Sequence, residues 1–167
     1  MSKFRKPHGQ YVRATADWFS DRRMALAGNQ VAVAGQSSTV SLYNDSTDGS
    51  TLHVVGLLGV STTANNGINV LLTKGTVGTP NGADPVPLGP FPVMLAGHVY
   101  TGATLTPPGD PAIWALAFLQ TQDAWPYEFA ICILPPGWSL VGKSSIINAT
   151  ISMYFQWLVM GHNQGYY

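Results

Sequence analysis

Residues 44–49 come nearest to a metal-binding motif in this sequence. The segment is rich in oxygen-bearing side chains and ends at Gly49, like the start of a calcium-binding loop. The twelfth position of such a loop needs an acid that binds with both oxygens, and Val55 stands there instead. Because the segment also joins two predicted strands, we interpret it as a polar hairpin turn. We predict neither a metal site nor a cofactor.

The remaining reactive side chains do not form a catalytic set. The four histidines are scattered, and no pair has metal-ligand spacing. No glycine-flanked serine elbow and no phosphate loop with lysine occurs. The single cysteine, Cys132, lies in the apolar run 129–134, which is typical of a small buried hydrophobe and excludes an internal disulfide. An enzyme would need acids to converge in space, for example Asp110, Asp123 and Glu128. We therefore predict that the protein is not an enzyme.

The start of the chain has features of a docking arm. Residues 1–23 hold six basic side chains against two acidic ones, while the rest of the chain has the opposite balance. Such an arm binds nucleic acid, acidic protein surfaces, an anionic membrane or the acidic body of a neighbouring copy, although a solvated terminus that binds nothing is an equal alternative. Aromatic side chains beside the arginines suit a partner pocket. The predicted partner-binding residues are Lys3, Arg5, Lys6, Arg13, Trp18, Phe19, Arg22, Arg23, Tyr166 and Tyr167.

The composition favours association with other protein subunits. Hydrophobic residues make up 46% of the chain, charged residues only 10%, and the formal net charge is +0. A typical soluble domain carries about a quarter charged residues. A monomer with so little charge lacks the self-repulsion that keeps proteins apart, so we expect its surface to meet other subunits.

Short apolar runs separated by turn residues predict strands throughout the body of the chain. Apolar residues alternate with polar ones in 39–43 and in 148–155, which places one side of each strand in a core. With 18 Gly and 12 Pro, helix content should be low. We predict strands at 29–34, 39–43, 52–60, 68–73, 91–95, 99–105, 113–119, 129–134, 139–141 and 146–159.

Many strands without intervening helices favour a sandwich or a barrel. Each half-apolar sheet must bury one face against another, so we predict an all-β antiparallel sandwich of the jelly-roll type. Residues 78–92 contain five prolines and should form an exposed loop or arm, because proline lacks the donor that a central strand needs. We predict an extended basic arm or docking segment at residues 1–26, of which 14–26 form a short helix or an extended segment, and the sandwich domain at residues 27–167.

Part of the sequence resembles known proteins. Residues 133–141, followed by the strand 151–157, look like small structural proteins of tailed bacteriophages, and residues 40–44 and 52–55 resemble their opening strands. Members of that group are β-sandwich components of virions. The resemblance implies a capsid decoration or cement protein, a head spike or a tail component. The basic segment before the first strand is longer than this group would suggest.

We therefore expect a decoration or cement protein of a phage head. Its partners would be the major capsid protein or another virion protein, together with copies of itself in a dimer or trimer. Nucleic acid is a less favoured partner, and a membrane is not expected because no run is long enough to span one. Since the start of the chain lacks the apolar stretch of an export signal, we expect assembly in the host cytoplasm. The alternatives are a tail or fibre module that binds host carbohydrate through 78–92 and 109–125, and, ranked last, a wall-degrading enzyme.

Overall fold

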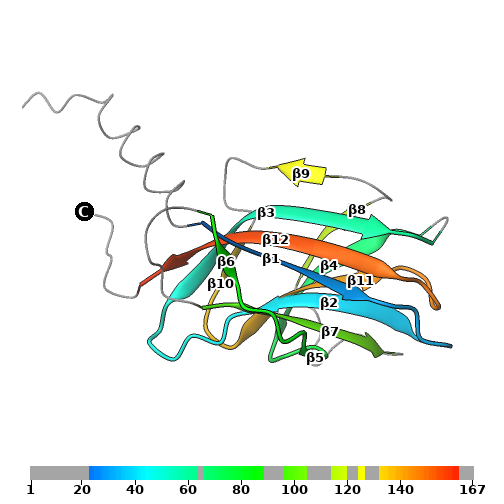
Figure 1. Ribbon diagram of the computed structural model, residues 1–167, viewed down its shortest axis with the longest axis horizontal. Coiled ribbons are helices and arrows are strands. Elements are labelled where there is room, and N and C mark those ends of the chain that lie inside the picture. Colours follow the sequence, from blue (N-terminus) through cyan, green and yellow to red (C-terminus); the bar gives the residue numbers. More distant parts are fainter. Residues whose placement is uncertain are drawn as a thin grey trace, which may run out of the picture.

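The strands of this computed structural model pair from the two ends of the chain inward. Every pair is antiparallel: β1 (Arg23–Gln30) lies beside β12 (Ile151–Met160), β2 (Ser37–Tyr43) beside β11 (Trp138–Ser144), β3 (Thr51–Ser61) beside β9 (Ala124–Pro126) and β10 (Cys132–Leu134), and β4 (Ile68–Lys74) beside β8 (Trp114–Leu119). The chain is thus a long two-stranded ribbon folded over on itself (Figure 1). This nested pairing is the topology of a jelly roll.

Two sheets of six strands each result from this winding, counted over the described residues. One sheet, here sheet A, has the order β10-β3-β12-β1-β6, with β9 also beside β3, and sheet B has the order β5-β7-β2-β11-β4-β8. Three strands, β5 (Thr79–Pro80), β6 (Val86–Pro87) and β7 (His98–Thr104), are inserted between β4 and β8. The structure describes residues 23–63, 66–88, 96–104, 114–119, 124–126 and 132–161, with only the backbone of β8 and β9. The predicted all-β antiparallel sandwich is confirmed.

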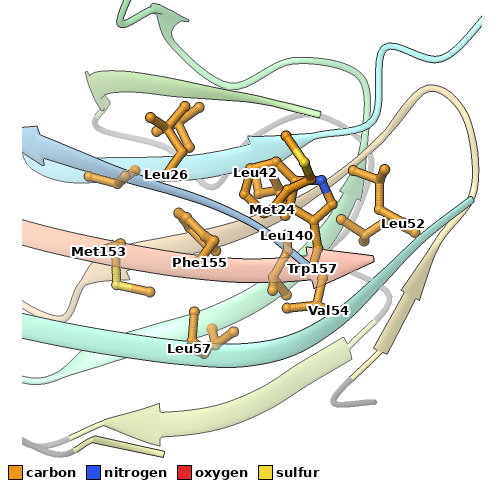
Figure 2. Close-up of a cluster of buried hydrophobic side chains, with 14 of the residues drawn as sticks. Met24, Leu26, Leu42, Leu52, Val54, Leu57, Leu140, Met153, Phe155 and Trp157 are labelled. Atoms are coloured by element: carbon orange, nitrogen blue, oxygen red, sulfur yellow. The ribbon is translucent and has the colours of Figure 1, made fainter. Parts of the chain in front are cut away.

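The core lies between the two sheets and follows from the alternation of residues along each strand. In β12 the residues Ile151, Met153, Phe155 and Trp157 all point inward and are fully buried or nearly so. Figure 2 shows Met153, Phe155 and Trp157 among buried side chains of β1, β2, β3 and β11. The indole Nε1 of Trp157 donates a hydrogen bond of 2.9 Å to the carbonyl of Ala96, which satisfies its polar atom inside the core. Trp157 is thus part of the core.

The first strand begins earlier than the sequence pattern indicates. Residues 23–26, which were predicted to belong to the arm, form the first half of β1, and the strand ends at Gln30, not at 34. Met24 lies beside Trp157 and is fully buried, and Leu26 lies beside Phe155. Alternating small and apolar residues after a basic run give a weak strand signal, but pairing with the long β12 overrides it. Residues 23–26 therefore belong to the sandwich.

The last strand begins later than predicted. Residues 146–148 are a loop and β12 starts at Ile151, because Asn148 adopts a left-handed backbone conformation with φ of 58°. A left-handed residue interrupts a strand, and asparagine is one of the few residues that tolerates it. Ile146 and Ile147, which were predicted to begin the strand, are exposed.

The described part of the proline-rich segment supplies edge strands, and the residues just before it cover the outer face of sheet B. Val86 and Pro87 add a two-residue edge strand to β1, a place where proline is tolerated. Ahead of them, the β4–β5 connection crosses the outer face of sheet B. There the Ser41 hydroxyl donates to the carbonyl of Val77 at 3.1 Å, and the Ser139 hydroxyl donates to the carbonyl of Gly75 at 2.6 Å. The buried hydroxyls of sheet B thus have partners.

Candidate assembly surface

Two loops at one end of the sandwich are held together by hydrogen bonds. The β1–β2 loop and the β11–β12 loop lie at the right-hand end of the molecule in Figure 1. The backbone N–H of Ala32 donates to the Thr150 hydroxyl at 3.0 Å, and that of Gly35 donates to Oδ1 of Asn148 at 2.6 Å. The N–H of Asn148 donates to the carbonyl of Gln36 at 2.9 Å. Because the bonds run in both directions, the two loops form one unit.

The β3–β4 connection joins the same end of the sandwich. The Ser145 N–H and hydroxyl both bond to Oδ1 of Asn66 at 3.1 Å, and the N–H of Gly67 donates to the Ser145 hydroxyl at 3.0 Å. The N–H of Thr150 donates to the Thr63 hydroxyl at 3.2 Å. Serine, threonine and asparagine side chains compete well for backbone groups in such turns. The end is therefore tied together by short polar side chains from three connections.

Aliphatic side chains protrude from this tied end. Val31 is 62% exposed and Ile147 is 53% exposed, and Val33 and Ile146 beside them are also exposed. Residues 31–36 and 145–148, which we call the loop-end surface, contain no charged side chain. Charge is depleted and apolar area is enriched in the cores of protein interfaces, so this surface has the chemistry of a docking site.

The loop-end surface was not predicted as a site. The sequence pattern predicts one strand that contains Ile146 and Ile147 and another that contains Val31 and Val33. The sequence does contain a signal for a turn here, because the turn-forming residues Ser144, Ser145 and Asn148 flank the two isoleucines. An apolar pair inside a turn has no core to enter and must protrude.

A second exposed apolar stretch lies on the edge of sheet A. Val86 and Leu88 are both exposed on and after β6, and the N–H of Leu88 donates to the carbonyl of Arg23 at 2.7 Å. Val86 lies beside Ala25 of β1, near the opposite end of the strand from the loop-end surface. The described part of the chain thus has exposed aliphatic groups in at least two separate places.

An ionisable pair lies at the other end of sheet B. Nδ1 of His98 and Oδ2 of Asp45 are 2.5 Å apart, while Oδ1 of Asp45 accepts the N–H of Gly97 at 2.9 Å. In a Ser-His-Asp triad, a carboxylate orients a histidine in this way while the other ring nitrogen contacts a nucleophilic hydroxyl. Among the described residues no hydroxyl or thiol bonds to His98. The pair fixes residues 97 and 98 beside the core.

Two tyrosines adjoin this pair on the outer face of sheet B. The rings of Tyr43 and Tyr100 meet edge to face, with centroids 5.6 Å apart and planes at 82°. Burial raises the pKa of Tyr100, and the negative charge of Asp45 adds to the effect. The Tyr100 phenol therefore stays protonated and neutral at ordinary pH, which suits hydrogen bonding to a neutral polar ligand.

Of the two acids in residues 44–49, Asp45 bonds to Gly97 and His98, and Asp48 bonds within the turn itself. Asp48 accepts hydrogen bonds from the N–H of Ser50 at 2.9 Å and the hydroxyl of Ser46 at 2.7 Å. These bonds from Ser50 and Ser46 lower the pKa of Asp48 to about 2. Nδ2 of Asn44 donates to the carbonyls of Ser50 and Leu134. Within the described ranges, no three His, Cys, Asp or Glu side chains come together in a way that would hold a metal ion.

The predicted partner-binding residues fall mostly outside the described residues. This applies to Lys3, Arg5, Lys6, Arg13, Trp18, Phe19, Arg22, Tyr166 and Tyr167, and also to the acids Asp110, Asp123 and Glu128 of the enzyme alternative. Arg23 is described, and it is the first residue of β1, beside Leu158. Its side-chain Nε is buried, and its position is that of a strand residue, not of a free arm.

Cys132 has the environment of an inert thiol. It lies beside Val54 and packs against the core, and burial raises the pKa of its thiol to about 12. The thiolate is the reactive form, so the thiol is unreactive at neutral pH. This environment agrees with the interpretation of Cys132 as a small buried hydrophobe.

Comparisons with known proteins return no relative. No family model matches the chain, and neither a curated protein nor a solved structure matches it. In the described part of the chain, no helix is long and apolar enough to cross a membrane.

Proposed function

We propose that this protein is a structural, non-enzymatic subunit of a phage virion. In this proposal it decorates or cements the phage head by binding a shell protein and copies of itself. The observation that carries the proposal is the loop-end surface, where exposed aliphatic side chains stand on hydrogen-bonded loops without any charged group. Isolated exposed aliphatic residues are ordinary, but four on two joined loops are typical of an interaction site.

A cementing subunit must contact more than one neighbour at once. The loop-end surface and the β6 edge lie on different parts of the sandwich, so the body can meet two partners without competition between them. The 10% content of charged residues favours both contacts, because little charge has to be desolvated when subunits meet.

The rigidity of the loops also supports an assembly role. Binding by a flexible loop loses free energy when the loop becomes ordered. Here the bonds of Asn148 to Gly35 and Gln36 already fix the two loops before any partner arrives. The surface is therefore preorganised for docking.

Purified phage particles provide the test. Mass spectrometry should find the chain in the particle in fixed ratio to the shell protein, and added protein should bind to particles that lack it. We expect Ile147→Asp to weaken particle binding by about ten-fold or more, since a charge enters an apolar contact. The matched control is Thr47→Asp, which adds the same charge to an exposed position in the β2–β3 loop at the other end of the sandwich. Absence of the chain from particles would overturn the proposal.

A carbohydrate-binding tail or fibre module is the second candidate. The cluster of Tyr43, Tyr100, His98 and Asp45 favours it, since aromatic rings beside hydrogen-bonding groups suit the faces and hydroxyls of sugars. In that case Tyr100→Ala would abolish binding to host cells or to a glycan array and leave particle assembly unchanged. Binding that is equal in both forms would exclude this candidate.

A further inference from the structure

We propose that the loop-end surface is where a second copy of this chain docks, in a symmetric contact between identical surfaces. The inference deepens the proposed function, because it assigns the contact between copies to one named surface and leaves the β6 edge for a different partner. It would bring together Val31, Val33, Ile146 and Ile147 of both copies.

The aliphatic character of the surface favours a copy over an unlike partner. Interfaces between identical subunits are more apolar than those of transient complexes between different proteins, which rely on aromatic and arginine anchors. Residues 31–36 and 145–148 contain neither an aromatic residue nor an arginine. All of the large exposed hydrophobic side chains on these two loops are valine or isoleucine.

The absence of charge on these two loops fits a symmetric contact. In such a contact, groups near the twofold axis meet the same groups of the partner, so any charge there would face a like charge. The loop-end surface has none. Lys143, on the outer face of sheet B between Thr39 and Asn69, is the nearest charged side chain along β11 and lies to the side of the loops.

The polar groups around the aliphatic centre can pair with themselves. Gln36 and Asn148 carry amides, and Thr62 of the β3–β4 connection carries an exposed hydroxyl. Amides and hydroxyls both donate and accept, so the same side chain on two copies can form a hydrogen bond where two carboxylates or two ammonium groups would repel. The polar groups around the aliphatic side chains are therefore compatible with the same groups on a second copy, as the aliphatic side chains are.

The β6 edge is less suited to the same role. Arg23 and Asp84 lie near Val86 in register and sequence, so a contact between apolar side chains there would also have to desolvate charged groups. Pro87 has no N–H, which removes one donor that pairing of two edge strands would need. An unlike partner with a complementary charge fits this edge better.

Sedimentation and light scattering of the full chain test the inference. At about 100 μM protein a contact with Kd near 10 μM is mostly occupied, so the wild type should be a dimer or larger. Ile147→Asp and Ile147→Lys should each weaken association by about ten-fold or more, while the control Thr47→Asp should not. Ile147 is 53% exposed, so we expect its substitution to leave the urea midpoint unchanged. An unchanged midpoint would show that the weaker association does not result from unfolding.

Mixing the two variants tests the symmetry. In a contact between identical surfaces, the Asp variant and the Lys variant bring opposite charges within about 10 Å, the screening length at 0.1 M salt. The mixture should therefore associate more tightly than either variant alone, and this gain should shrink as salt is added. Docking of the surface onto a different part of the neighbour would give no such gain.

Two results would overturn the inference. One is a wild-type monomer at 100 μM, and the other is association that Ile147→Asp leaves unchanged. Particle binding by the same variants reports the proposed function separately. If Ile147→Asp loses particle binding but keeps wild-type association, the surface docks on the shell protein and only the inference fails. If the chain is absent from particles but the mixing gain occurs, only the proposed function fails.

Discussion

Asn148 accepts a 2.6 Å hydrogen bond from the N–H of Gly35 and thereby connects the last loop of the sandwich to the first. Its own N–H donates to the carbonyl of Gln36, and its φ of 58° is the only left-handed non-glycine backbone angle among the described residues. One residue therefore orders both halves of the loop-end surface. Strain of this kind persists only where surrounding contacts determine it.

Substitution of Asn148 should separate the backbone requirement from the side-chain bond. Asn148→Gly keeps the left-handed conformation and loses the bond, so we expect a loss of about 0.5–1.5 kcal/mol in the free energy of unfolding. Asn148→Ala loses the bond and adds the strain of a Cβ at positive φ, which should bring the loss to about 2–3 kcal/mol. Urea unfolding measures both, and equal losses would show that the backbone angle carries no strain.

Truncation at the start of the chain should locate the boundary of the sandwich. A chain that starts at residue 23 keeps all of β1, whereas one that starts at residue 27 loses Met24 and half of the ladder with β12. Met24 is fully buried, and removal of such a side chain alone destabilises by about 2–5 kcal/mol. We therefore expect the shorter chain to be less stable by at least that amount. Equal unfolding midpoints would place the boundary at residue 27 after all.

Most of the strands could be predicted because the alternation of apolar and polar residues along each one indicates which side is buried. Residues 39–43 and 151–157 alternate strictly, and they form β2 and most of β12. β1 gives a weaker signal because Ala25, Ala27 and Gly28 are poor markers of a strand, and its formation depends on β12, more than 120 residues away in the sequence. Pairing over that distance leaves no local trace.

The candidate site was harder to predict than the fold. Ile146 and Ile147 directly precede an apolar strand pattern, so the sequence predicts that they are buried. The turn at Asn148 ends that pattern and leaves both side chains exposed. The docking role of this turn depends on the neighbouring loop at residues 31–36, whose proximity follows only from the nested strand pairing. The predicted arm remains a prediction, since its residues before 23 lie outside the described part.

His53 should make stability depend on pH. It lies in β3 between Leu158 and Ile133, and burial lowers its pKa from the ordinary value of 6.5. Below pH 6.5 the unfolded chain takes up a proton that the folded chain resists, so the stability present above that pH is lost as pH falls. We expect the urea midpoint of the wild type to drop between pH 7 and pH 5 by more than that of His53→Gln. Parallel curves for the two proteins would contradict this assignment.

Two glycines on facing sheets let the sheets interlock. A Cβ on Gly28 of sheet A would lie 2.6 Å from Cγ1 of Val99 and 2.7 Å from Cγ1 of Val40, both in sheet B. In return, Met153 beside Gly28 fills the space over Gly142 of sheet B, where a Cβ would lie 2.8 Å from its Sδ. Large groups of each sheet thus pack over a glycine of the other.

The two glycines should respond differently to the same added methyl group. Gly28→Ala pushes against branched, stiff valines, so we expect a loss of about 1–3 kcal/mol in the free energy of unfolding. Gly142→Ala meets the flexible end of a methionine and should lose less. In a Val99→Ala background the loss from Gly28→Ala should shrink, because one of its two closest contacts is gone. A loss that is the same in both backgrounds would mean that contact with Val99 does not set the spacing of the sheets at this point.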